Sequence, residues 1–261
     1  MRTSTVAAVE GYDETTYGRA FADVYDEWYD DVSDVDATVT TLGALAAEVA
    51  GNAVAEVLEL GVGTGRLAVP LATDDRRHRR VTGVDASPEM LTLLAEHDPD
   101  GLVRRIEGDM VAAMPDGPFH LAFVAYNTLF NLTGDGEQAR CFRSVADRLV
   151  PGGRFVVEAF VPDEPPREGD VVSVRTLTAD KVVLSISRHD AEQRTAQGQF
   201  VELTEAAGVR LRPWSIRYSS PGELDAMAAD AGLRLESRWL DVRRRPFDAD
   251  ADRHVSVYRR D

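Results

Sequence analysis

Strand-length apolar runs alternate with amphipathic runs along much of the chain. The alternation extends from Val54 to Phe160, where each apolar run is followed by a segment whose apolar positions recur at helical spacing. Because parallel strands are joined by crossovers that are usually helical, this pattern predicts a parallel, doubly wound α/β sheet. We expect the first five strands of the sheet in this region.

The pattern changes after the fifth predicted strand. Three prolines, at positions 162, 165 and 166, lead into runs that lack helical periodicity. Four such runs follow, at residues 171–178, 181–188, 197–203 and 209–218. The short turns between them, such as Ala179-Asp180, predict an antiparallel sheet inserted into the fold.

A last helix and two strands complete the predicted core. The helix begins after Ser220 and ends at Gly232, and the strands are expected at 233–240 and 255–259. The predicted fold class is therefore α/β: a Rossmann-like, doubly wound, seven-stranded sheet with an antiparallel β cap inserted after the fifth strand.

These patterns divide the chain into three units. We expect a helical lid at residues 1–50, a core at 51–162 and 219–261, and the cap at 163–218. Within the lid, residues 12–31 combine several acids with six aromatic residues: Tyr12, Tyr17, Phe21, Tyr25, Trp28 and Tyr29. One amphipathic helix packed on the core accounts for most of these aromatic positions.

A glycine-rich turn follows the first predicted strand. Its glycines, at positions 61, 63 and 65, allow positive φ angles and let a ligand approach the main chain. The third glycine comes one residue earlier than in the dinucleotide-binding fingerprint, and Glu59 stands at the end of the strand. A carboxylate there repels a pyrophosphate and attracts an ammonium group, such as the amino acid end of S-adenosylmethionine. The turn therefore favours a charged amino acid joined to a nucleoside over NAD.

Acids also end the next two predicted strands. Asp85 follows a short apolar run, and Asp109 stands just past the end of the strand predicted within residues 103–110. Ligands of doubly wound sheets lie beyond the carboxyl ends of the strands, where Asp85 can accept hydrogen bonds from two ribose hydroxyls. Asp109 is a candidate acceptor for an adenine amino group. Ser87 and Pro88 are the expected N-cap and first residue of the helix after Asp85.

Together these motifs resemble those of the class I S-adenosylmethionine-dependent methyltransferases. The resemblance rests on the glycine turn, Asp85, Gly108-Asp109-Met110, and Leu149-Val150-Pro151-Gly152-Gly153 before the fifth strand. It is close over residues 54–160 and continues beyond them in the order of the elements. It implies that S-adenosylmethionine is the cofactor, that S-adenosylhomocysteine is the product, and that no metal is needed.

The resemblance also assigns residues to the site. The cofactor-binding positions come from the lid, the strand ends and the segment after the fourth strand: Tyr25, Glu59, Gly61, Gly63, Gly65, Arg66, Asp85, Ala86, Met90, Gly108, Asp109, Met110 and Tyr126. In such enzymes N-terminal tyrosines close over the ligands and the segment after the fourth strand lies beside the methyl group. Tyr17 and Asn127 are therefore candidate catalytic residues. Glu158, near the end of the fifth strand, is the third candidate, because it points into the cleft if the sheet is regular.

Three further residues are candidate contacts of the methyl acceptor. Asn131 can hold a polar group, and Trp214 and Arg217 belong to the cap, which emerges where the methyl group is presented. Trp214 can instead anchor the cap to the core. The chain has no Asn-Pro-Pro-Tyr or Asp-Pro-Pro-Tyr motif after the fourth strand, which disfavours adenine amino groups and glutamine as acceptors.

Composition narrows the range of partners. The 45 acidic and 29 basic residues give a formal net charge of -16, which disfavours nucleic acid and anionic membranes as partners. Cys141 is the only cysteine, so an intrachain disulfide and a multi-cysteine metal site are excluded. No apolar run reaches the ~18 residues of a membrane span and no signal-peptide pattern is present, so we expect a cytoplasmic protein. A homodimer is compatible with these features.

We therefore expect a methyltransferase that acts on a small molecule by direct displacement. Nitrogen is the first choice of acceptor, followed by carbon or oxygen of an aromatic ring. The cap and the tyrosine-rich N-terminus resemble aminosugar N-methyltransferases and indole C-methyltransferases of actinobacterial secondary metabolism. The alternative is a noncatalytic sensor or partner subunit that binds S-adenosylmethionine or S-adenosylhomocysteine. A dinucleotide oxidoreductase ranks below both because of the glycine spacing and Glu59.

Overall fold

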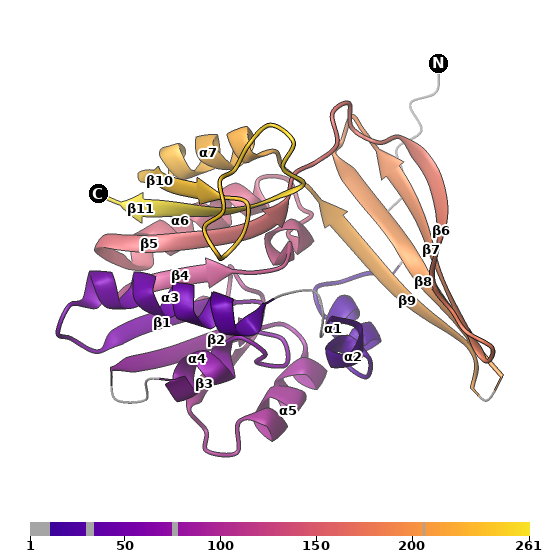
Figure 1. The fold of residues 1–261 in the computed structure, drawn as a ribbon, viewed down its shortest axis with the longest axis horizontal. Helices are drawn as coiled ribbons and strands as arrows, with labels where there is room; N and C mark the ends of the chain where they lie inside the picture. The colour runs from indigo at the N-terminus through magenta and orange to yellow at the C-terminus, as the bar shows by residue number, and fades with distance from the viewer. Residues whose placement is uncertain (1–10, 30–33, 75–77, 206) are drawn as a thin grey trace.

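The computed structural model describes residues 11–29, 34–74, 78–205 and 207–261. Its central element is a seven-stranded sheet in the order β10-β11-β5-β4-β1-β2-β3 (Figure 1). The parallel strands are β1 (Ala55–Leu60), β2 (Arg79–Asp85), β3 (Val103–Glu107), β4 (Phe119–Val124) and β5 (Leu149–Phe160). The other two are β10 (Leu233–Trp239) and β11 (Arg253–Arg260), and β11 runs antiparallel to both of its neighbours. The predicted seven-stranded α/β sheet is confirmed.

Helices cover both faces of this sheet. One face carries α3 (Val35–Ala50) and α4 (Ala68–Asp74), the other carries α6 (Glu137–Arg148) and α7 (Pro221–Asp230), and α5 (Pro88–His97) packs beside β2 and β3. Each face has its own hydrophobic core, because strand residues alternate between the two sides. The core beneath α6 is rich in aromatic rings, with Phe142 in edge contact with Phe155 and with Tyr258.

The predicted helix starts at Ser87 and Ser220 are present. The Met90 backbone N–H donates to the Ser87 hydroxyl at 3.2 Å, at the start of α5. At the start of α7, the Ser220 hydroxyl accepts from the Glu223 backbone N–H and the Glu223 carboxylate accepts from the Ser220 backbone N–H. Each cap satisfies backbone N–H groups that have no partner within the first turn of a helix.

The inserted segment forms a separate antiparallel sheet, the cap sheet. Its strands are β6 (Gly169–Leu177), β7 (Lys181–Asp190), β8 (Thr195–Thr204) and β9 (Gly208–Arg217), and they lie in this order. They correspond to the four predicted runs. Figure 1 shows the cap sheet standing to one side of the central sheet, with the N-terminal helices between the two.

The N-terminal region differs from the prediction of one helix over residues 12–31. The structure has two short helices, α1 (Thr16–Phe21) and α2 (Tyr25–Tyr29), and residues 30 and 31 lie outside the described ranges. The intervening turn brings the rings of Phe21 and Trp28 to 6.0 Å, whereas residues seven apart in one helix are separated by ~10.5 Å along its axis. Both rings thereby reach Phe200 of the cap sheet, at 5.9 and 5.5 Å.

Only part of the region predicted as a lid stands apart from the core. The helix α3 falls within residues 1–50, yet Leu42 and Leu45 bury it against the central sheet. The helices α1 and α2 instead lie between the cap sheet and the core, and we call residues 16–29 the lid (Figure 1).

The aromatic core gives a test of the fold. Phe155 is fully buried in β5, so Phe155→Ala should lower the free energy of unfolding by about 3–5 kcal/mol through lost burial and a residual cavity. Glu96→Ala is the control, because Glu96 is exposed on α5 and its loss should change the free energy by less than about 0.5 kcal/mol. Urea unfolding measures both, and equal effects would contradict this description of the core.

Candidate functional site

A cleft of about 520 Å³ opens at the carboxyl ends of the parallel strands, between the core and the lid. Its floor comes from the turns that follow β1, β2 and β3, and its other walls come from the lid and from the segment after β4. Parallel strands present their carboxyl ends at one edge, so residues far apart in sequence meet there. This volume is typical of a small-molecule site.

Two glycines of the turn after β1 have different steric roles. Gly61 has a φ of +68°, and a Cβ there would come within 2.3 Å of the Thr128 methyl group. Gly63 has a φ of +56° and faces open space, because the nearest atom to its missing Cβ belongs to Tyr25, at 4.0 Å. Gly61 therefore permits close packing of the chain, and Gly63 leaves room for a ligand beside its backbone.

Asp85 links the glycine turn to the helix α5. Its Oδ2 accepts a hydrogen bond from the Gly63 backbone N–H at 2.8 Å, and its Oδ1 accepts one from the Ser87 backbone N–H at 2.9 Å. Burial raises the pKa of Asp85, and these two hydrogen bonds oppose the rise. The carboxylate lines the cleft, where its remaining lone pairs can accept from ligand hydroxyls.

Asp109 occupies the corresponding place after β3. Its Oδ1 accepts hydrogen bonds from the backbone N–H groups of Val111 and Ala112, at 3.0 and 2.7 Å. These contacts hold the turn, and both Asp109 and Met110 line the cleft.

Two tyrosines of the lid also line the cleft. The Tyr17 hydroxyl lies 3.0 Å from the Tyr29 hydroxyl, and the Tyr17 ring stacks on Phe21 at 4.3 Å. Burial raises the pKa values of Tyr17 and Tyr25, so both phenols stay protonated near neutral pH. Tyr17 can therefore donate a hydrogen bond but is unsuited to be a general base.

The cleft brings together about half of the residues predicted from the sequence. Those lining it are Tyr17, Tyr25, Gly61, Gly63, Asp85, Ala86, Met90, Asp109, Met110 and Asn131. Gly65 and Gly108 lie outside its walls and permit tight packing instead. A Cβ at Gly65 would meet Leu94 at 2.8 Å, and one at Gly108 would meet Ala113 at 2.5 Å.

Four other predicted residues gather behind the glycine turn, outside the walls of the cleft. The Arg66 guanidinium stacks on the Tyr126 ring, 4.3 Å from its centroid, and donates to the Tyr29 carbonyl at 2.8 Å. Burial raises the pKa of Glu59 well above its ordinary value and raises the pKa of Glu158 as well. The positive charge of Arg66 partly opposes both increases.

The expectation that Glu158 points into the cleft is wrong. Its side chain lies on the α3 side of β5, beside a small separate cavity that Val242 also lines. Alternate strand residues face opposite sides of a sheet, so Glu158 shares the side of Val156 rather than that of Val157. The Tyr126 backbone N–H donates to its carboxylate at 3.4 Å.

Asn127 is likewise turned away from the cleft. It precedes the short 3-10 helix η2 (Thr128–Asn131), and its side-chain Oδ1 accepts a hydrogen bond from the Phe160 backbone N–H at 2.7 Å. This contact ties the segment after β4 to the end of β5, which gives Asn127 a turn-forming role in the structure.

The two predicted cap residues lie apart from each other. Trp214 packs beside Phe200 on the face of the cap sheet that meets the lid, in the hydrophobic cluster around Phe21 and Trp28. Arg217 lines a second cleft, of about 410 Å³, formed with α6 and α7. Its guanidinium lies 3.8 Å from the exposed carboxylate of Asp135.

Sequence reasoning missed most of the acidic wall. Asp13, Glu14 and Glu137 line the cleft with the predicted Asp85 and Asp109, giving five carboxylates. Among the residues that the structure describes, no Lys, Arg or His side chain lines it. Asp13 and Glu14 stand next to Tyr12 in the acidic, aromatic segment predicted from the sequence, but only the fold brings them opposite the strand ends.

None of the helices in the described ranges combines the length and apolarity needed to cross a bilayer. The His, Cys, Asp and Glu side chains of the same ranges form no group of three that could hold a metal ion.

The chain is similar in sequence and fold to known methyltransferases. A family model described as a methyltransferase domain matches residues 57–153. The CcbJ methyltransferase from Streptomyces caelestis is 40% identical in a structural match that covers 95% of this chain and 99% of that one, with a TM-score of 0.84. CalS10, an amino pentose methyltransferase from Micromonospora echinaspora solved with bound S-adenosylmethionine, shares the fold at 22% identity, with coverages of 91% and 97% and a TM-score of 0.68.

A curated relative matches a shorter stretch. The cypemycin N-terminal methyltransferase from Streptomyces sp is 32% identical over 150 residues, which are 56% of this chain and 60% of that protein. The chain thus aligns with about three fifths of that relative's length. The full-length match to CcbJ, together with the glycine turn and acids at the strand ends, shows that the chain belongs to the S-adenosylmethionine-dependent methyltransferases.

Proposed function

We propose that this protein transfers a methyl group from S-adenosylmethionine to a nitrogen of a small-molecule amine of secondary metabolism. The observation that carries the proposal is the acidic cleft, with five carboxylates and, in the described part of the chain, no cationic wall residue. Such walls attract a protonated amine and repel an anionic acceptor. The curated relative is named as a methyltransferase of an N-terminus, which also supports nitrogen as the acceptor.

The residues of the cleft suit the cofactor. We assign the ribose hydroxyls to Asp85, the adenine to Asp109 and Met110, and the methionine portion to the turn at Gly61 and Gly63. The open space beside Gly63 supports this placement, because a side chain there would fill it. A second support is Glu59, whose buried Oε2 has no hydrogen-bond partner among the described residues: a ligand ammonium group placed near it would satisfy this oxygen and favour the ionised carboxylate, which burial alone disfavours.

The chemistry asks little of the protein beyond positioning. Bound S-adenosylmethionine would supply an electrophilic methyl group with a neutral thioether as the leaving group, so the protein needs no general acid. An amine that enters the cleft protonated would first give up a proton to water or to one of the cleft carboxylates, which frees the nitrogen lone pair for the new bond to carbon. The carboxylates of Asp13, Glu14 and Glu137 attract the amine, and Tyr17 can hold a polar group of the acceptor by donating a hydrogen bond. Alignment of this kind can lower a barrier by about 7–11 kcal/mol.

A homodimer would use the outer face of the cap sheet. On the side away from the lid, cross-strand rows of apolar residues are open to solvent, and Val172, Val174, Leu177, Val209 and Leu211 are each at least 57% exposed. Two chains of net charge -16 repel each other, so an uncharged apolar face is the surface that two copies can bury. With strands ~4.8 Å apart and ~3.4 Å per residue, the apolar rows, about six residues long and four strands wide, span about 400 Å². That is about half of the ~800 Å² per partner of a standard interface.

The ribose assignment is tested by Asp85→Ala. The substitution removes a charge-assisted hydrogen bond worth about 1.5–3 kcal/mol, so the affinity for S-adenosylmethionine should fall at least ~10-fold. Calorimetry measures this, with Asp116→Ala as a control because Asp116 is fully exposed and outside the cleft wall. Unchanged affinity in Asp85→Ala would refute the assignment.

The acceptor class is tested by following S-adenosylhomocysteine release with amines, aminosugars, indoles and phenols. We expect turnover of amines or aminosugars, with the new methyl group on nitrogen by mass spectrometry. Turnover of indoles or phenols alone would favour carbon or oxygen as the acceptor. Tight cofactor binding without turnover of any compound would favour the sensor, and a preference for protein or nucleic acid would overturn the small-molecule proposal.

The dimer is tested by Leu211→Asp, which places a charge on the outer face of the cap sheet. Light scattering after size-exclusion chromatography should show a dimer for the unmodified chain and a monomer for this variant. Leu235→Asp, on β10 of the central sheet and 39% exposed in the wild type, should stay dimeric. A monomeric unmodified chain at micromolar concentration would rule out this interface.

A further inference from the structure

Three cations from three strands of the cap sheet surround one aromatic residue of the lid. Arg175 of β6, Lys181 of β7 and Arg212 of β9 lie 4.7, 5.9 and 5.4 Å from the Trp28 ring. Each also makes a polar contact with the lid or with the turn between its helices. The inner face of the cap sheet is thus basic where it meets an acidic lid.

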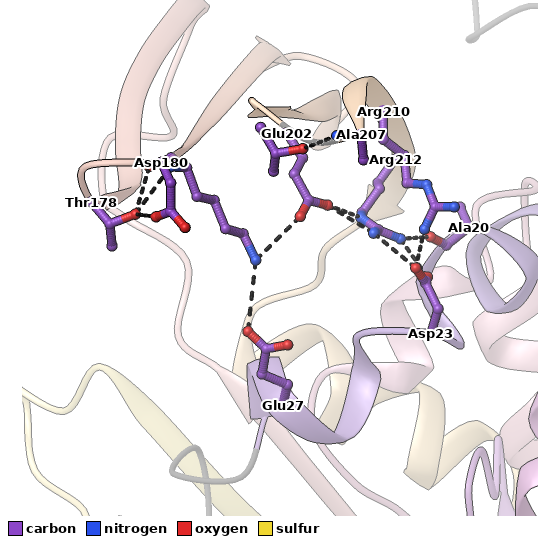
Figure 2. Close-up of polar contacts among 11 residues, drawn as sticks. Ala20, Asp23, Glu27, Thr178, Asp180, Glu202, Ala207, Arg210 and Arg212 are labelled. Carbon is purple, nitrogen blue, oxygen red and sulfur yellow. Dashed lines mark hydrogen bonds and ion pairs between the residues drawn. The ribbon is translucent and has the colours of Figure 1, made fainter.

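Arg212 is the centre of these contacts (Figure 2). Its side chain is only 1% exposed, and its guanidinium donates to the Asp23 carboxylate at 2.6 Å and to the Glu202 carboxylate at 2.8 Å. It also donates to the Ala20 carbonyl, at the end of α1. A buried guanidinium with two carboxylates and a carbonyl holds the α1–α2 turn against the cap sheet in one geometry.

We call the contacts of Arg175, Lys181 and Arg212 with the lid the junction, and the first two of these cations extend it along α2. The Nζ atom of Lys181, the single lysine of the chain, lies 3.2 Å from the Glu202 carboxylate and 3.7 Å from the Glu27 carboxylate. Arg175 donates to the Trp28 carbonyl at 3.0 Å. The cap sheet supplies every cation of this junction, and the lid supplies acceptors from both of its helices and from the turn between them.

The opposite side of α2 is bonded to the glycine turn. The Thr64 hydroxyl donates to the Asp26 carboxylate at 2.8 Å, and the Arg66 guanidinium donates to the Tyr29 carbonyl at 2.8 Å. Thr64 stands between Gly63 and Gly65 in the sequence. One short helix therefore bridges the cap sheet and the turn assigned to the cofactor.

We propose that Arg212 is a positioning residue for cofactor binding, acting through the lid. By holding Ala20 and Asp23, it places Tyr17 and Tyr25 along the cleft and Asp26 against the glycine turn. This inference rests on the proposed placement of the cofactor at that turn. The contact of the lid with the cap sheet and the binding of the cofactor at the glycine turn favour the same position of the lid. Each therefore strengthens the other by an equal factor.

The test compares Arg212→Met with the unmodified chain, using S-adenosylhomocysteine as the probe. Calorimetry should show at least ~10-fold weaker binding in the variant. Hydrogen exchange should become faster in residues 16–29 and also in residues 61–66, because both segments depend on the lid. Arg212→Lys keeps the charge but loses the paired donors, so its affinity for S-adenosylhomocysteine should lie between those of the unmodified chain and Arg212→Met.

Two arginine variants serve as controls. Arg188 makes a comparable ion pair with Asp170, but within the cap sheet and 59% exposed, so Arg188→Met should bind S-adenosylhomocysteine within twofold of the unmodified chain. Arg79 is buried against α4, where it donates to the Leu71 carbonyl at 2.7 Å. Arg79→Met should lower the thermal unfolding midpoint without a tenfold change in affinity, which separates positioning from general destabilisation.

The outcomes are distinguishable. Failure of the unmodified chain to bind S-adenosylhomocysteine would refute the proposed cofactor site itself. Binding by the unmodified chain with equal affinity in Arg212→Met would overturn the positioning role alone, even if the lid exchanges faster. If Arg212→Met does not fold, Asp23→Asn decides the matter, because it weakens the same contact from the half-exposed lid side and should lower the affinity in the same direction.

Discussion

The site depends on one carboxylate that joins two parallel strands at their carboxyl ends. Asp85 ends β2, and its two oxygens accept hydrogen bonds from the turn after β1 and from the start of α5. This arrangement is possible because β1 and β2 are parallel neighbours, with Leu60 paired to Val84. Had the strands been antiparallel, the two turns would lie at opposite ends of the sheet and no ligand could contact both.

The charge of the cleft shows how a local site can differ from its surroundings. The chain carries 28% charged residues and many ion pairs, yet the cleft walls include carboxylates without a cationic partner on the same surface. Glu137 pairs with Arg140 of its own helix at 3.5 Å, whereas Arg66 lies behind the glycine turn and Arg212 lies between the lid and the cap sheet. The cleft carboxylates that have no cation beside them keep their field for a ligand. This separation is the physical basis of the proposal that the acceptor is an amine.

The lid connects the two parts of the molecule by contacts of different kinds. Its aromatic residues pack in one cluster with Phe200 and Trp214 of the cap sheet. This hydrophobic packing stabilises the contact but is non-directional and does not by itself fix the orientation of the lid. Its carboxylates and carbonyls bond to buried or stacked cations, which fixes the geometry. Through Asp26, the same helix reaches Thr64 of the glycine turn. A segment with both kinds of contact can close a cleft and still hold its tyrosines in defined positions.

The sequence by itself determined the local elements and the residues at their ends. Period-2 and period-3.6 patterns predicted the central sheet and the cap sheet, and the acids after β2 and β3 marked the cleft, because these signals depend on neighbours within a few residues. The tertiary structure decided which side each of the other predicted side chains faces. Glu158 turned to the α3 side of β5, Asn127 bonded to the chain at Phe160, and Asp13 and Glu137 joined the cleft wall. The placements of Asn127, Asp13 and Glu137 depend on contacts between segments distant in sequence, such as Asn127 with Phe160, and no local pattern encodes them.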